Sequence, residues 1–285
     1  MDSTRSLARR AGLLYVLASS IAPFAYLYVP SVLIVQGDAV ATADRVRASE
    51  GLLRAAIVGE LCGATLLAFA ILALYELFKR VDPKTSKLMA VLMAVSVPVS
   101  FMNALNNIAP LVLLKSSEIT AVLDPGQVAA QVTFFLRLHA YGLFVGQILW
   151  GLWLFPIGVL VMRSGFFPRW LAYPLFFAGA GYVLNSVGTL LLPPSLRWIT
   201  GSLQILGVGE MPFFNFYLLI WGVRGHAVDR LAALLVVTIF VLGIAGVVML
   251  LLHRINTTQY SALALTSLAL VFALVMRWRS QPSEA

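Results

Sequence analysis

The chain is poor in charged residues, which make up 11% of its 285 positions, whereas 60% are hydrophobic. A soluble domain carries about 25% charged residues, so there are too few charges here to cover a water-facing surface. Apolar runs of about 20 residues recur along the chain, which is the length that a helix needs to cross a bilayer. The sequence therefore predicts an all-α, polytopic transmembrane helical bundle.

The chain is also poor in metal-binding and redox-active side chains. It has 1 cysteine, Cys62, and 3 histidines, of which His226 and His253 lie in predicted loops. A single cysteine excludes an internal disulfide and dithiol chemistry. One remaining histidine cannot form a bis-histidine haem set or a three-histidine metal site, so we expect no metal and no cofactor.

Several catalytic signatures are missing as well. The chain has no HExxH, no GxSxG and no P-loop, which sets aside zinc proteases, serine hydrolases and ATP-driven pumps. Every aspartate falls outside the predicted spans, which removes the paired aspartates of an intramembrane aspartyl protease. The sequence therefore favours a protein that is not an enzyme, without settling the question.

The net charge is +8, but it does not indicate nucleic acid as a partner, because no basic run is interleaved with aromatic residues. Basic residues instead flank the apolar runs on one side. Of the 20 lysines and arginines, 13 fall on the side of the two termini and 7 on the other. The positive-inside rule then places both termini in the cytoplasm.

Eight spans are predicted, divided into a six-span core over 1–230 and a C-terminal two-span hairpin with a short tail over 231–285. Their approximate limits are 11–34, 55–78, 88–114, 142–162, 170–192, 199–222, 231–252 and 259–276.

Two connections on the side away from the termini are longer than turns. Residues 36–54 are typical of an interfacial helix with Asp38 as its N-cap. The sequence DPGQ, which starts at Asp124, indicates a turn and precedes a helical approach to the fourth span. This approach places Arg137 and His139 at the membrane boundary, and their two-residue spacing directs them to different helix faces. We expect His139 to face inward and Arg137 to reach the head groups.

The stretch from 158 to 186 carries a recognisable combination of motifs. Within the stretch are Arg163-Ser164-Gly165, Pro168-Arg169-Trp170-Leu171 and Ala178-Gly179-Ala180-Gly181-Tyr182. His139 precedes the stretch, and Gly209-Glu210 follows it. Over about residues 8 to 226 the chain resembles a bacterial integral membrane family catalogued as domain-of-unknown-function family 4386. The resemblance implies a multi-pass protein of the bacterial cytoplasmic membrane and brings no activity with it. The usual leucine-glycine after proline-arginine is Leu171-Ala172 here.

The motifs themselves have a simple physical interpretation. Gly165 is suited to a turn, Pro168 to the start of the next helix and Trp170 to the membrane interface. The small residues of the glycine-rich motif permit close contact between helices. Five side chains are expected to be interfacial anchors: Arg54, Arg137, Arg163, Arg169 and Trp170.

Polar side chains at membrane depth are the candidate functional residues, because burying them in lipid is costly. In the predicted topology Glu60, Asn107, Asn185 and Gln204 each lie about 10 Å from the same membrane face. We expect an outward-opening polar pocket whose candidate residues are Glu60, Asn103, Asn107, His139, Gln147, Gln204 and Glu210.

Three functions remain open at this stage. The first is a bundle that binds or transports a lipid or a small hydrophobic or amphipathic molecule. The second is an intramembrane enzyme that modifies lipids, with His139 or a glutamate as the general base. The third is a structural or sensory subunit whose polar residues only hold helices together. In each case membrane lipids are expected partners.

Overall fold

The computed structural model describes residues 2–196 and 214–223, and the regular elements within these residues are helices. Five helical segments are long and apolar enough to span a membrane, and they correspond to the first five predicted spans. They are Thr4–Leu33, Glu50–Phe78, Pro83–Lys115, Pro125–Arg163 and Arg169–Leu191. The last two predicted spans, and most of the sixth, lie outside the described residues.

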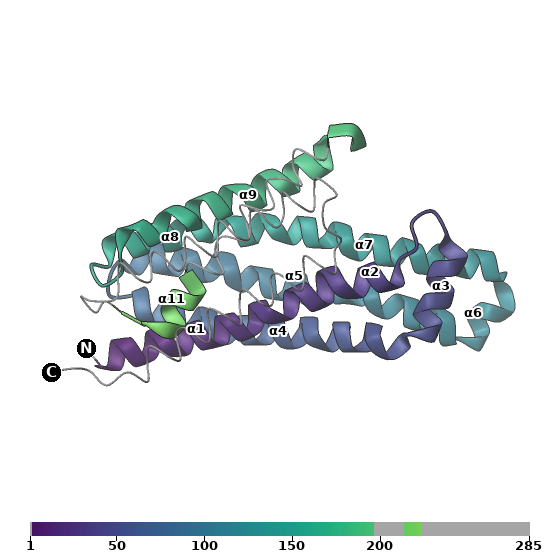
Figure 1. Ribbon diagram of the computed structural model, residues 1–285, viewed down its shortest axis with the longest axis horizontal. Coiled ribbons are helices and arrows are strands. Elements are labelled where there is room, and N and C mark those ends of the chain that lie inside the picture. Colours follow the sequence, from purple (N-terminus) through teal and green to yellow (C-terminus); the bar gives the residue numbers. More distant parts are fainter. Residues whose placement is uncertain (1, 197–213, 224–285) are drawn as a thin grey trace, which may run out of the picture.

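The first three spans lie side by side in an elongated bundle (Figure 1). The first begins as α1 (Asp2–Ala22), continues through the π-helix η1 (Pro23–Tyr28) and ends as α2 (Val29–Leu33). It packs along α4 (Glu50–Phe78), which packs against α5 (Pro83–Lys115).

The fourth span packs on α5, and the fifth span packs on the fourth. Helix α7 (Pro125–Leu152) packs on α5 and is followed, after a break at Trp153, by α8 (Leu154–Arg163). The break is caused by Pro156, which has no N–H to donate to the carbonyl of Leu152. A 3₁₀ turn η2 (Arg169–Leu171) then leads into α9 (Ala172–Leu191), which packs on both α7 and α8.

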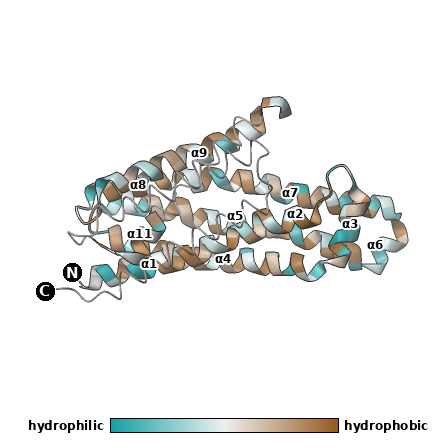
Figure 2. Cartoon of the chain, viewed as in Figure 1, coloured by the Kyte–Doolittle hydropathy of each residue, from teal (hydrophilic) through white to brown (hydrophobic). Residues whose placement is uncertain are grey.

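Short helices lie at the two ends of the bundle (Figure 1). At one end α3 (Ala39–Ala48) and α6 (Ser117–Val122) connect long helices. The other end holds α11 (Phe216–Ile220), which packs on α1, while η3 (Pro194–Leu196) follows α9. Figure 2 shows hydrophobic residues along the long helices and hydrophilic ones gathered at both ends, as expected of helices that cross a bilayer.

Two connections have the start signals that the sequence predicts. Asp38 is the N-cap of α3, because its side chain accepts a hydrogen bond of 2.9 Å from the N–H of Ala41. Asp124 and Gln127 form a reciprocal capping box at the start of α7. The helix begins at Pro125 and runs unbroken past His139, so the predicted helical approach and the first part of the fourth span form one continuous helix.

The loop between α8 and η2 also folds as predicted. Gly165 has φ 68°, the left-handed conformation that glycine adopts without strain. Pro168 precedes η2, and Trp170 packs edge-on against Tyr217 with ring centroids 6.4 Å apart. This loop therefore joins α8 and α9 tightly and contacts the segment that contains α11.

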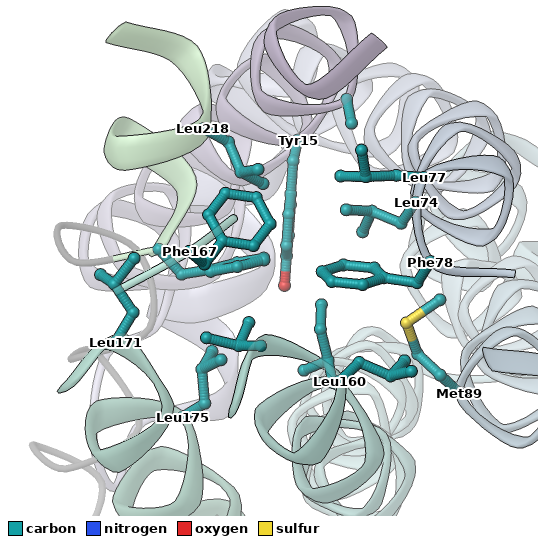
Figure 3. Packing of buried hydrophobic residues seen from close by; sticks show 14 of the residues in the cluster. Tyr15, Leu74, Leu77, Phe78, Met89, Leu160, Phe167, Leu171, Leu175 and Leu218 are labelled. Atoms are coloured by element: carbon teal, nitrogen blue, oxygen red, sulfur yellow. The ribbon is translucent and has the colours of Figure 1, made fainter. Parts of the chain in front are cut away.

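Apolar side chains form two separate cores along the bundle. The α8-end core includes Tyr15, Phe78, Leu160 and Phe167 and is drawn in Figure 3. The α3-end core is built from α2, α3 and the adjoining ends of α4, α5 and α7. Only two buried hydrophobic residues of the described chain belong to neither core, and both are alanines, Ala64 and Ala104.

The region between the two cores is here called the middle zone. Its fully buried residues are small or polar: Glu60, Ala64, Ser96, Asn103, Ala104, Asn107, His139, Gly146 and Gln147. Partly buried aromatic side chains, those of Tyr26 and Trp150, adjoin them. The candidate site lies in this zone.

Candidate functional site

Glu60 is the centre of the site. It lies on α4, where the chain is otherwise apolar, and only 5% of its surface is exposed. Its Oε1 accepts a hydrogen bond of 3.2 Å from the side-chain amide of Asn107 on α5. Its Oε2 lies 3.1 Å from Nε2 of His139 on α7. Both carboxylate oxygens are therefore bound by side chains from two other membrane-spanning helices.

A polar face of α5 holds this arrangement in place. Ser96, Ser100, Asn103 and Asn107 recur at helical spacing along it. The side-chain amide of Asn103 donates a hydrogen bond of 3.1 Å to the backbone carbonyl of His139. Asn103 can approach α7 this closely because Gly142 has no side chain, and a Cβ there would overlap its amide.

The site includes one residue that the sequence did not single out. Tyr26 lies in the π-helical turn η1, and its ring centroid is 6.2 Å from that of His139. Pro30 has no N–H to donate to the carbonyl of Tyr26, and the N–H of Val29 bonds instead to the carbonyl of Phe24. Single π turns inside α-helices are frequent at functional sites. In the sequence, the irregular turn at Tyr26 is indicated only by the two prolines that flank it, at positions 23 and 30.

Gln147 is not in direct contact with Glu60. Its side-chain oxygen accepts a hydrogen bond of 2.8 Å from the amide of Asn185 on α9. The Oγ of Ser186, next to Asn185, is buried and has no hydrogen-bond partner among the residues that the structure describes. The structure thus gives Gln147 a role between α7 and α9, while Gln204 and Glu210 lie outside the described residues.

Arg137 and His139 point to different sides of α7. His139 is 4% exposed and lies inside the bundle, whereas Arg137 is exposed on its surface. This is the arrangement that their two-residue spacing predicts. The contact of His139 with Glu60 brings together two of the predicted pocket residues.

The other predicted anchors lie near the two ends of the bundle. Arg54 donates to Glu50, with 2.6 Å between Nε and Oε1, and Arg169 is exposed at the start of η2. Arg163 pairs with Asp82, the N-cap of α5. Hydrogen bonds from Thr85 to Asp82, together with Arg163, hold the pKa of this carboxyl below its ordinary value. Arg163 therefore joins α8 to α5 as well as lying at the surface.

The chemistry available at the cluster of Glu60, Asn107 and His139 is that of binding and of holding a proton. Within residues 2–196 and 214–223 there is no group of three side chains that could hold a metal ion. Among the same residues, the imidazole of His139 contacts Glu60, and its backbone carbonyl accepts a hydrogen bond from Asn103. The cluster is thus a buried group of two ionisable side chains and an amide.

The long apolar helices, with a polar cluster enclosed between them, are those of a polytopic α-helical membrane protein. Residues 10–222 match the family described as "Domain of unknown function (DUF4386)", and the chain belongs to this family. This match confirms the resemblance seen in the sequence motifs.

A similar protein is an "Uncharacterized protein" of Archaeoglobus fulgidus, 35% identical over 81 residues. The aligned part is 27% of this chain and 44% of that protein, so the chain spans less than half of its relative's length. No solved structure matches the chain.

Proposed function

We propose that the protein binds a small amphipathic molecule or a lipid in the middle zone, at the cluster of Glu60, Asn107 and His139, and that binding serves its transport or sequestration. The observation that carries the proposal is the burial of a carboxylate between three membrane-spanning helices. An ionisable side chain at membrane depth is costly to insert and marks a functional site by default.

The composition of the middle zone supports the same proposal. The fully buried hydrophobic residues between the two cores are alanines. The rings of Tyr26 and Trp150 lie beside the polar cluster. Aromatic side chains around a few convergent polar groups are typical of a ligand site.

The test is whether a molecule is retained by purified protein in a way that depends on His139. We expect mass spectrometry of an organic extract to find one compound in near-stoichiometric amount with the wild type and with Arg137→Gln. His139→Gln should deplete it about tenfold, because Glu60 loses the imidazole that fixes the position of its Oε2. Arg137→Gln is the matched control, because Arg137 lies two residues away on the same helix and is exposed. Equal retention by all three proteins, or no retained compound, would contradict the proposal.

A second candidate function is a structural subunit whose polar side chains fasten the helices together. The hydrogen bond between Asn185 and Gln147 favours it, since it joins α9 to α7 without any charged group. If His139→Gln lowers the stability of the protein but no compound is ever retained, this second function replaces the first.

We also propose that the protein lies in the bacterial cytoplasmic membrane, with a six-span core over 1–230, a C-terminal hairpin over 231–285 and both termini inside. The 13-to-7 distribution of basic residues supports this orientation. Reporter fusions after Ala285, which lies outside the described residues, and in the connection at α6 are expected to lie on opposite membrane sides. Fusions reporting the same side would reject the orientation and the even number of spans.

A further inference from the structure

Among the described residues, the carboxylate of Glu60 has no basic side chain beside it other than His139. Each lysine and arginine of the described chain is exposed or half-buried, and none of them forms an ion pair with Glu60. The second hydrogen-bond donor, the amide of Asn107, is neutral. Within the described part of the chain, the site therefore offers a carboxyl group to a cationic ligand, whereas an anionic ligand would find no cationic partner other than His139.

Aromatic rings continue from the cluster toward α9. Tyr26 lies between His139 and Trp150, and its ring is nearly parallel to that of Trp150, with an interplanar angle of 26° and centroids 6.4 Å apart. Trp150 in turn meets the edge of Tyr182 at 6.3 Å. These three residues, here called the aromatic row, offer ring faces with negative potential next to the carboxylate. Cations bind such faces, and tryptophan binds them best.

There is also room beside the aromatic row. A Cβ added at Gly146 would meet only Trp150, at 3.8 Å, among the described residues. The neighbouring glycines of α7 are different, because a Cβ at Gly142 would overlap Asn103 and one at Gly151 would lie 2.6 Å from the carbonyl oxygen of Gly179. Gly146 is therefore the one of these three glycines at which the described residues leave room for an added methyl group.

We infer that the ligand is a lipophilic organic cation, an amine or a quaternary ammonium with apolar substituents, whose charge lies between Glu60 and the aromatic row. Glu60 neutralises the charge, the rings of Tyr26 and Trp150 contact the substituents, and the space at Gly146 admits them. This inference rests on the proposed function and names the chemical class of ligand for that same site.

Two probes of equal shape and opposite charge test whether the site accepts a cation or an anion. Radiolabelled tetraphenylphosphonium and tetraphenylborate are offered to the purified protein by equilibrium dialysis, with protein-free micelles as the blank. We expect saturable binding of tetraphenylphosphonium and none of tetraphenylborate. Saturable binding of tetraphenylborate alone, if it is reduced by Gly146→Phe, would overturn the cationic class but leave the binding site in place. If neither probe binds and no compound is retained on purification, both proposals fail.

Variants then locate the binding site. Glu60→Gln keeps the shape of the side chain and should weaken tetraphenylphosphonium binding at least about tenfold. Trp150→Leu should weaken it about threefold or more. The matched control is Glu76→Gln, which removes an exposed glutamate on the same helix that pairs with Lys79 and should leave binding unchanged. Each variant is first compared with the wild type by circular dichroism. Wild-type affinity in Glu60→Gln, or equal losses in Glu60→Gln and Glu76→Gln, would overturn the inference.

Discussion

Replacing His139 by leucine is expected to lower the free energy of unfolding by about 3 kcal/mol, because it leaves a buried carboxylate without its partner. The two side chains are 5% and 4% exposed, and their polar atoms are 3.1 Å apart. Glu60→Leu should also destabilise the protein, through the loss of the partner of His139. The double variant should lose less of its free energy of unfolding than His139→Leu alone. In the double variant two apolar side chains fill the space, and no charged group is left buried without a partner.

The measurement is reversible unfolding of the purified protein in mixed micelles, with the four proteins of a double-mutant cycle compared. The matched control is the neutral pair Gln147 and Asn185, which also joins two helices. Its coupling energy should be smaller, about 0.6 kcal/mol, as is common for neutral hydrogen bonds between membrane helices. Additive effects of Glu60→Leu and His139→Leu would mean that the two groups are not coupled as their geometry requires.

Gly151→Ala is the second substitution with a large expected effect, a loss of about 2 kcal/mol of stability. A Cβ at Gly151 would lie 2.6 Å from the carbonyl oxygen of Gly179 and 2.7 Å from Val183. A backbone carbonyl cannot rotate away as a side chain can, so α9 would have to move off α7. Thermal unfolding of the purified protein measures the effect.

Gly146→Ala, five residues earlier on the same helix, is the matched control. Among the described residues its new methyl group would meet only Trp150, at ordinary contact distance. Since alanine favours helix over glycine by about 1 kcal/mol, this variant should be as stable as the wild type or more so. A loss in Gly146→Ala as large as that in Gly151→Ala would show that helix contact at Gly179 is not the cause.

The parts of the fold that depend on local chemistry were predictable from the sequence. Hydropathy marks the first five spans, and the side chains of Asp38 and Asp124 mark the starts of two helices. Equal depth in neighbouring spans brings Glu60 and Asn107 together, because adjacent antiparallel helices align residues at one level. These features need only helix geometry and the alternation of direction.

The remaining features depend on packing that the sequence does not encode locally. Hydropathy reports where lipid contacts a helix and not where the helix begins, so the start of α7 is marked by the capping box at Asp124 and not by the apolar run. Equal depth in the membrane does not determine which polar side chains form hydrogen bonds with each other. Gln147 therefore bonds to Asn185 and not to Glu60. Tyr26 lies next to His139 because of a π turn, and the position of a π turn is hard to predict from sequence.

The π turn from Pro23 to Tyr28 gives this helix the equivalent of one inserted residue. Ala8, Ala11 and Tyr15 pack in the α8-end core, whereas Val29 and Leu33 pack in the α3-end core. Because the wide turn takes up the extra residue, both ends of the helix can keep these contacts. Deleting one residue from the turn would leave a regular α-helix with the same two ends, but it would rotate Tyr26 by about 100° relative to one of them and so remove its contact with His139.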